Sequence, residues 1–380
     1  MRRYVIALSM LATAAGTPTS ALAGSLNPPP GPVTSTMKTL SDVEPRTALS
    51  QANTPGNVTN QFKITQPGSY YLAGDIIASP GANPCILITA NDVTLDLNGF
   101  SVRAAAAEGI HIAGDRVLIR NGKLSMSAGS ADGIYMQDGA DDIVIEDMTI
   151  TGVGGSCVRT QSACNSVTIR DTKVMGGQYG VLLTSADTSS TLSHVQCFGA
   201  SRVGLFLSDR ATLEDCVVRE TGNAGGIVGY GIYVGQASSI RNCQVLDSLY
   251  VGAAAPATGI SASGNSTIDG CTVYSRGSVG VRLSGQGTTL RNSRVTMGAA
   301  GQTAVALSNG DSFIADNQIT APTGIAVQLN SATGNTVIRN HLANATTAIA
   351  GSAVSSNIIG PTASNGNPTA NTNPHANFVN

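Results

Sequence analysis

The chain repeats a short phrase that begins with a small residue and continues apolar–variable–apolar, as in Gly109-Ile110-His111-Ile112. The shortest step between phrases, from Ala304 to Gly324, is 20 residues, and the longest, from Gly231 to Gly259, is 28. A recurrent period of this size is typical of a solenoid, whose units bury their apolar faces only by stacking. The alternation within each phrase indicates strands rather than helices. The phrases begin at Gly109, Gly133, Cys157, Gly180, Gly204, Gly231, Gly259, Gly280, Ala304, Gly324 and Ala348.

Each repeat contains three short predicted strands, of which the phrase above is the first. The second strand ends in isoleucine or leucine at Ile119, Ile145, Ile169, Leu192, Leu213, Ile240, Ile268, Leu290, Ile314 and Ile338. Two residues later stands Asn, Asp, His or Gly, residues that best tolerate a left-handed backbone. We therefore expect a tight left-handed corner before the third strand. The corner residues are Asn121, Asp147, Asp171, His194, Asp215, Asn242, Gly270, Asn292, Asp316 and Asn340.

The composition agrees with many short strands and turns, since glycine is abundant at 44 residues and tryptophan is absent. Residues 1–23 have the pattern of a secretory signal peptide: Arg2 and Arg3 precede an apolar stretch, which ends at the small-residue site Ala21-Leu22-Ala23. We expect cleavage near Ala23 and export to the periplasm or the medium. No later segment is apolar over a membrane-spanning length, and no basic block favours nucleic acid.

The remaining chain is expected to divide into four parts. Residues 24–60 form a Pro-rich extended leader, and residues 61–84 form strands that cap the first edge of the solenoid. The coils occupy residues 85–360. The tail, residues 361–380, has low complexity and is expected to lack regular structure, with a capping role as the alternative.

Seven cysteines in an exported chain raise the question of disulfides. Cys216, Cys243 and Cys271 occupy one position in three successive repeats, where other repeats place Thr172, Val195 or Ser293. We interpret this column as packing of small side chains. Cys157 and Cys164 flank one strand and its turn, and a disulfide between them is left open.

Three parallel strands per repeat with an Asn/Asp corner resemble the right-handed parallel β-helix of the pectate-lyase-like superfamily. Within it, the chain is most similar to exported bacterial β-helix proteins that are mostly uncharacterised. The resemblance implies an all-β chain of about 12 coils with an N-terminal cap. The motifs that carry it are Leu26-Asn27-Pro28-Pro29, Met37-Lys38-Thr39-Leu40, Val43-Glu44-Pro45-Arg46, Ile64-Thr65-Gln66-Pro67-Gly68-Ser69-Tyr70-Tyr71-Leu72 and Val93-Thr94-Leu95-Asp96-Leu97-Asn98-Gly99-Phe100.

The resemblance also implies that chemistry takes place on the outer face of the first sheet. Successive members of this outer column should lie about 4.8 Å apart. A stripe of aromatic rings and arginines suits a polysaccharide, because sugars stack on rings and present hydroxyls and carboxylates. Phe206, Tyr233 and Arg282 are the expected substrate-binding residues; an ordinary sheet surface is the alternative. The whole column is His111, Tyr135, Arg159, Leu182, Phe206, Tyr233, Ser261, Arg282, Ala306 and Ala326.

His111, Tyr135 and Arg159 are the candidate catalytic residues. They lie on three adjacent coils, so their Cα atoms should fall within roughly 10 Å. Elimination from a uronic acid needs the carboxylate neutralised, which Arg159 could do. It also needs an α-proton removed and the leaving oxygen protonated, which Tyr135 or His111 could do. The alternative is an exposed column without a catalytic role.

Asp115 and Asp138 form a second candidate site, because they lie one coil apart at nearly the same offset. Carboxylates about 5 Å apart could be a retaining hydrolase pair or ligands of Ca²⁺. Turn chemistry is the alternative interpretation. The sequence indicates no other cofactor.

The resemblance carries no catalytic residue over to this chain. The Asn-Thr-Asp, Asp-Asp, Gly-His-Gly and Arg-Ile-Lys set of polygalacturonases is incomplete, and the Trp-x-Asp-His pattern of pectate lyases is absent. Two functions are therefore expected. One is a secreted protein that binds a polysaccharide and cleaves it, by elimination in preference to hydrolysis. The other is a non-catalytic structural or adhesive surface module. The sequence leaves open whether the protein is an enzyme and whether it forms oligomers.

Overall fold

The computed structural model divides the chain into two units, residues 1–44 and 45–380, and the account below concerns the second. The predicted signal peptide and most of the predicted leader lie outside the described residues. The description covers residues 45–78, 81, 83–104, 108–127, 132–184, 189–222, 229–248, 257–330, 333–351, 354–364 and 373–379.

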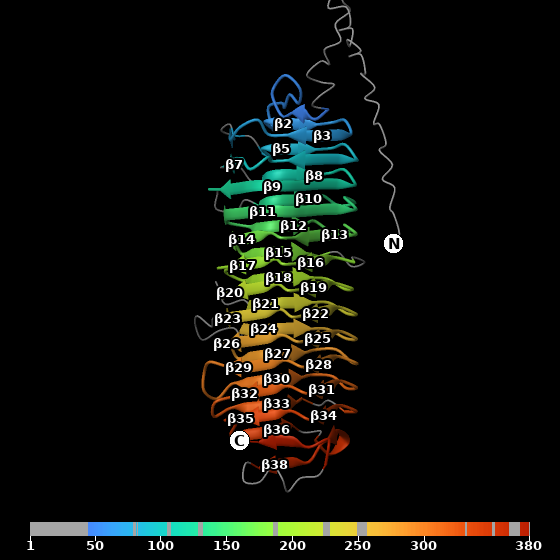
Figure 1. Cartoon of the computed structure of the whole chain (residues 1–380), viewed down its shortest axis with the longest axis vertical. Coiled ribbons are helices and arrows are strands. Elements are labelled where there is room, and N and C mark those ends of the chain that lie inside the picture. The colour runs from blue at the N-terminus through green and yellow to red at the C-terminus, as the bar shows by residue number, and fades with distance from the viewer. Residues whose placement is uncertain are drawn as a thin grey trace, which may run out of the picture. The chain divides into compact units, whose positions relative to one another are not determined.

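The second unit is a stack of β-coils, visible as successive rungs in Figure 1. The first strands of the coils pair in parallel into one 13-stranded sheet over the described residues. We refer to it as the first sheet. Its strands are β2 (Phe62–Ile64), β5 (Ile86–Ile88), β8 (Glu108–Ile112), β10 (Asp132–Met136), β12 (Ser156–Thr160), β15 (Tyr179–Leu183), β18 (Val203–Leu207), β21 (Gly229–Val234), β24 (Ala257–Ala262), β27 (Val279–Leu283), β30 (Thr303–Leu307), β33 (Ile325–Leu329) and β36 (Thr347–Gly351).

The second strands of the coils form a parallel column of their own. The long strands β9 and β11 belong to this column with their first halves and to the third column with their second halves. The second column is β3 (Gly68–Tyr71), β6 (Val93–Asp96), β9 (Val117–Met126), β11 (Ile143–Val153), β13 (Val167–Arg170), β16 (Thr191–Ser193), β19 (Thr212–Glu214), β22 (Ser239–Arg241), β25 (Thr267–Asp269), β28 (Thr289–Arg291), β31 (Phe313–Ala315), β34 (Thr336–Ile338) and β37 (Ile358–Ile359).

The third strands complete the coils, so the expected β-solenoid of three strands per coil is confirmed. The short β1 (Thr47–Ala48) and the 3-10 turn η1 (Val354–Ser356) lie near the two ends of the stack. The third column is β4 (Ile76–Ile77), β7 (Ser101–Ala104), β9, β11, β14 (Lys173–Gly176), β17 (Gln196–Phe198), β20 (Val217–Arg219), β23 (Gln244–Ser248), β26 (Thr272–Ser275), β29 (Arg294–Met297), β32 (Gln318–Thr320), β35 (His341–Ala343) and β39 (Asn377–Val379).

The small residue that opens each repeat has a steric reason. An ideal Cβ at Gly231 would lie 2.4 Å from Val245 Cγ1 of the same coil and 2.6 Å from the Gly259 carbonyl oxygen of the next. The opening glycine is thus pressed between the third strand and the neighbouring coil. One predicted opener is wrong, Gly324. Pairing of Val305 with Val327, and of Val327 with Ile349, puts Ala326 in the place that Ala304 and Ala348 occupy.

The predicted left-handed corner is confirmed at nine of its ten positions, Asn121 to Asp316, where φ lies between 49° and 66°. The tenth prediction, Asn340, is wrong by one residue: Arg339 takes the corner, with φ of 55°. In the same repeat, Val337 rather than Ile338 pairs with Ile314. Asn340 is instead fully buried, and its side-chain amide donates to the carbonyl oxygens of Ile314 and Ile338.

The buried column that contains Cys216, Cys243 and Cys271 continues into an asparagine ladder. Asn317 Nδ2 donates to Asn340 Oδ1 (2.9 Å), and Asn340 Nδ2 donates to Asn377 Oδ1 (3.1 Å). All seven cysteines are buried and free, so a disulfide between Cys157 and Cys164 is not formed. The Cys164 thiol donates to the Gln137 carbonyl oxygen instead (3.0 Å).

The two ends of the stack are built from the segments expected to be cap and tail. In residues 61–84, β2, β3 and β4 pair with β5, β6 and β7 in parallel, so this segment forms the first coil. At the other end, β39 pairs with β35, and β38 (Thr362–Ser364) pairs with β39. The described part of the tail is therefore ordered and lies over the last coil edge, as in the capping alternative. Among the described residues, no helix is long and apolar enough to cross a membrane.

We expect Gly231→Ala to destabilise the stack by about 1–3 kcal/mol, because the added methyl group has no space in the core. Urea denaturation followed by circular dichroism measures this loss. Gly74→Ala is the matched control, since a Cβ there meets nothing within 4 Å. Equal unfolding midpoints for the two variants would contradict the steric explanation of the repeat.

Candidate functional site

The three candidate catalytic residues lie together on the outer face of the first sheet. His111 pairs in register with Tyr135, and Tyr135 with Arg159. The His111 and Tyr135 rings meet edge to face, with centroids 5.0 Å apart. The Arg159 guanidinium carbon lies 5.6 Å from the centroid of the Tyr135 ring. The parallel register thus produces a continuous imidazole–phenol–guanidinium row.

Two acidic residues that the sequence analysis did not identify complete the row. Glu108 Oε2 lies 2.6 Å from His111 Nδ1, and Asp132 Oδ2 lies 3.2 Å from Arg159 Nη1. Glu108 and Asp132 are themselves paired in register. Each stands directly before an opening glycine, Gly109 or Gly133, in two consecutive repeats. That shared position is the sequence feature by which these two acidic residues could have been identified.

His111 is held at both ring nitrogens, since Gln137 Oε1 lies 3.1 Å from Nε2. A carboxylate at one nitrogen and an amide oxygen at the other suit the doubly protonated imidazolium. Burial lowers the pKa of His111. The hydrogen bond and charge of Glu108, with the bond to Gln137, outweigh burial, and the pKa lies above its usual value.

Tyr135 is held in its neutral form. Burial raises the pKa of its phenol, the nearby Arg159 lowers it, and Glu108 and Asp132 raise it further, so that the net shift is upward. A protonated phenol between an imidazole and a guanidinium can donate a proton to an oxygen placed above the row.

A cavity of about 300 Å³ opens beside Arg159. Asp132, on its wall, is buried, and its other oxygen, Oδ1, accepts a hydrogen bond from the Ser156 backbone N–H (2.6 Å). Arg159 is anchored by one nitrogen, which leaves the rest of its planar donor fork available to a ligand. The lining residues are Asp132, Gly155, Ser156, Arg159, Gln178, Tyr179 and Leu182.

The expected substrate-binding residues form a second part of the same face. Phe206 and Tyr233 stack with centroids 4.5 Å apart and planes at 9°, and Tyr230 meets Tyr233 edge-on at 5.4 Å. Burial raises the pKa of Tyr230, against the opposing charge of Arg282. Arg282 follows one coil later than Ser261, which pairs with Tyr233.

The predicted stripe is shorter than expected. Ser261 is only 2% exposed, so accessible outer-face side chains do not run without a break from Tyr233 to Arg282. The last predicted member, Ala326, is wrong: Gln328 pairs with Ala306, and Ala326 is buried. The reason is the two-residue error in the opener of that repeat.

In the hydrogen-bond ladder along the stack, Asp115 is followed by Asp141 and not by Asp138. Asp115 Oδ1 accepts a hydrogen bond from the Asp141 backbone N–H (3.3 Å), whereas Asp138 Oδ1 accepts one from Ser162 Oγ (2.9 Å). Asp115 follows the end of its strand at Ile112 by three residues, and Asp141 follows Met136 by five, so the longer turn moves Asp138 out of line. Among the described residues, no group of three or more His, Cys, Asp or Glu side chains could hold a metal ion.

Coils of three parallel strands, with a polar and aromatic row on the outer face of the first sheet, define a β-helix protein. The family described as the right-handed beta helix region matches residues 108–255 and 230–372, and the chain belongs to it. No curated protein matches the chain.

The chain is similar to several solved structures. The Azotobacter vinelandii mannuronan C-5 epimerase AlgE6 A-module has a TM-score of 0.54 at 15% identity, over 78% of this chain and 91% of that one. PfbA, a surface adhesin of Streptococcus pneumoniae, has a TM-score of 0.49 at 8% identity, over 77% and 85%. DFA-IIIase from Arthrobacter chlorophenolicus A6 has a TM-score of 0.48 at 12% identity, over 80% and 85%. At these identities the likeness shows the fold alone.

We expect Glu108→Gln to lower the pKa of His111 from above about 6.5 to below it, because burial then dominates. NMR titration of the imidazole protons measures the shift, with His111→Gln used to assign the signal. Glu220→Gln removes an exposed carboxylate elsewhere and should leave the His111 pKa unchanged. An unaltered His111 pKa in Glu108→Gln would contradict the assignment of the pair.

The same pair makes stability depend on pH. Since the folded pKa of His111 is raised, its contribution is complete below about pH 6.5 and is lost as the pH rises through the folded pKa. The difference in melting temperature between the wild type and Glu108→Gln should therefore be larger at about pH 5.5 than at about pH 9. Thermal unfolding at both pH values measures this difference. A difference that grows toward alkaline pH would contradict the sign.

Proposed function

We propose that this is an exported β-helix protein that binds a polymer containing uronic acids and cleaves it by β-elimination. The observation that carries the proposal is the in-register row His111–Tyr135–Arg159, with Glu108 and Asp132 behind it and the cavity beside Arg159. Residues 1–23, outside the described part of the chain, would direct the export.

Each group in the row has a task in elimination. The Arg159 guanidinium binds the uronate carboxylate and so makes the α-proton more acidic. Once the Gln137 amide has moved away from Nε2, neutral His111 removes that proton through Nε2, and the electron pair of the broken C–H bond forms a carbon–carbon double bond. The bond from the β-carbon to the glycosidic oxygen then breaks, and the Tyr135 hydroxyl protonates the departing oxygen. Glu108 orients the imidazole and stabilises it once it carries the proton.

Elimination is favoured over hydrolysis because both carboxylates of the row are already engaged. Glu108 holds His111 and Asp132 holds Arg159, so neither is placed as an unpaired acid or nucleophile. The Phe206–Tyr233 stack, farther along the first sheet, would contact sugar units beyond the reacting one. Mannuronan, the polymer named for the epimerase module above, is a polyuronate and is the first substrate to test.

Incubation with mannuronan and polygalacturonate should release an ultraviolet-absorbing unsaturated product. Arg159→Ala and Tyr135→Phe should each lower its rate of formation by a factor of about 100 or more, because each removes one transition-state interaction. Arg219→Ala, which removes an exposed arginine on β20, is the control and should retain full activity. If a broad glycan panel shows neither cleavage nor binding, the proposal is wrong and the structural or adhesive alternative is favoured.

The elimination rate should rise with pH through the raised pKa of His111, because only the neutral imidazole accepts a proton. In Glu108→Gln the rising part of the pH–rate profile should move to lower pH, as the supporting negative charge is lost. Initial rates between about pH 5 and pH 9 measure both curves. A profile that falls over this range in the wild type would exclude His111 as the base.

A further inference from the structure

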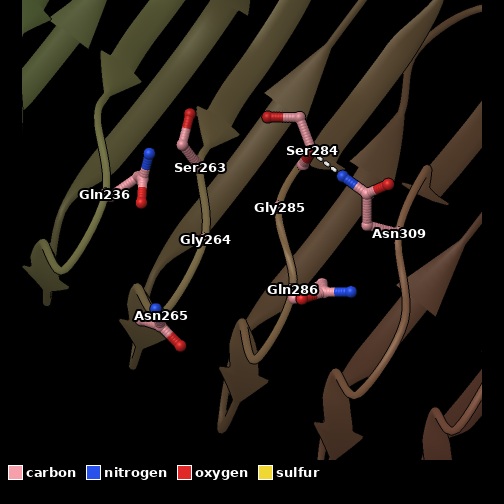
Figure 2. Close-up of a pocket in the computed structure, with 8 residues that line it drawn as sticks. All are labelled: Gln236, Ser263, Gly264, Asn265, Ser284, Gly285, Gln286 and Asn309. Carbon is pink, nitrogen blue, oxygen red and sulfur yellow. Dashed lines mark hydrogen bonds between the residues drawn. The ribbon is translucent and has the colours of Figure 1, made fainter.

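A second cavity, of about 510 Å³, lies in the turns that follow four consecutive strands of the first sheet, β21, β24, β27 and β30. Its volume falls within the range typical of small-ligand sites. Figure 2 shows its lining residues along four neighbouring coils. They are Gln236, Ser263, Gly264, Asn265, Ser284, Gly285, Gln286 and Asn309.

The lining contains two glycines between longer amide side chains. Gly264 and Gly285 lie in the two middle turns, and Gln236 and Asn309 lie in the outer ones (Figure 2). An ideal Cβ at Gly285 would lie 2.0 Å from the Gly264 backbone nitrogen, so no side chain fits there. Close packing of the turns therefore keeps this floor free of side chains.

Part of the lining has an evident structural role. Asn265 adopts a left-handed backbone with φ of 57°, which asparagine tolerates well, and Asn309 Nδ2 donates to the Ser284 carbonyl oxygen. The Ser284 hydroxyl donates to the Ala262 carbonyl oxygen (3.2 Å). These residues are explained by the turns themselves.

Gln236 and Gln286 have no such role. Neither has a positive φ, and glutamine is not a turn-forming residue. Both side chains are exposed, and among the described residues neither amide has a protein hydrogen-bond partner, so both are accessible to a ligand. Each amide offers two donors and one acceptor oxygen at the rim of the cavity. Ser263 adds a hydroxyl on the same wall.

The absence of charged side chains from the lining argues against charged ligands. The lining holds no charged side chain, so it provides no cation for a carboxylate or phosphate and no anion for a metal or an amine. We propose that this cavity binds a neutral, polyhydroxylated ligand, namely a neutral sugar unit. Hydroxyl groups of such a ligand both donate and accept, which matches side-chain amides and hydroxyls.

This site is separate from the uronate site and goes beyond the proposed function. Strand β24, which leads into Ser263, follows β12, which carries Arg159, by four steps in the first sheet. At about 4.8 Å per strand the two sites are roughly 19 Å apart. Ser263 and Ser284 lie two residues after Ser261 and Arg282, and so continue the outer face of the sheet.

Isothermal titration of the full-length mature protein with maltotriose, cellotriose, mannotriose and galactotriose tests the proposal. At least one should bind at concentrations up to about 10 mM, with an affinity that does not change with salt. The double variant Gln236→Ala/Gln286→Ala should weaken binding about tenfold, through the loss of two sets of hydrogen bonds. The matched control is Gln244→Ala/Gln318→Ala, which removes two exposed glutamines on β23 and β32 and should bind as the wild type does.

The variant Arg159→Ala tests whether ligand binding at the two sites is independent. It should abolish binding of trigalacturonate and leave binding of the neutral trisaccharide intact. The proposal is overturned if none of the neutral sugars binds, if the Gln236→Ala/Gln286→Ala variant binds with unchanged affinity, or if Arg159→Ala abolishes binding of the neutral sugar. Absence of trigalacturonate binding in the wild type would contradict the proposed function and not the proposal for this cavity.

Discussion

The structure depends on the parallel hydrogen-bond ladder that ties each coil to the next. It sets one spacing, about 4.8 Å, for every side chain that occupies the same position in successive coils. That spacing leaves no room for a side chain at Gly231, which lies against the Gly259 carbonyl oxygen of the following coil. It also places unlike groups next to each other on the outside, so that the ladder builds the scaffold and the candidate site at once.

The ladder explains why much of the fold could be predicted from the sequence and where prediction failed. A position is found by counting from the previous coil, so an error arises where a turn changes length. Two extra residues in the turn after β10 replace Asp138 by Asp141 as the neighbour of Asp115. In other repeats local cues conflict: Gly324 looks like an opener beside Ala326, and Asn340 is a better corner residue than Arg339. The positive φ of Arg339 and the inward hydrogen bonds of Asn340 show that Arg339 turns.

The candidate site shows a different limit. His111, Tyr135 and Arg159 could be named because they share one predicted position, but Glu108 and Asp132 could not, since they lie outside the phrase that was counted. The pairing of these side chains with His111 and Arg159 depends on the folded first sheet and cannot be counted from the repeated phrase. These carboxylates matter because they decide protonation: burial alone would lower the pKa of His111, and Glu108 reverses the direction. The row thus becomes a charge-paired group in which the pKa of the imidazole lies above its usual value.

The two proposed sites together constrain the proposed ligand more than either does alone. Around Arg159, an anionic sugar is favoured by a guanidinium fork; around Gln236 and Gln286, a neutral sugar is favoured by uncharged amides. Between them, the Phe206–Tyr233 stack offers an apolar surface that is indifferent to charge. A polymer of uronates only would leave the amide cavity without a matched partner, and a neutral polymer would leave Arg159 without one. A mixed chain, with neutral units some 19 Å from an acidic one, would satisfy both sites, because the fixed ladder cannot change their separation.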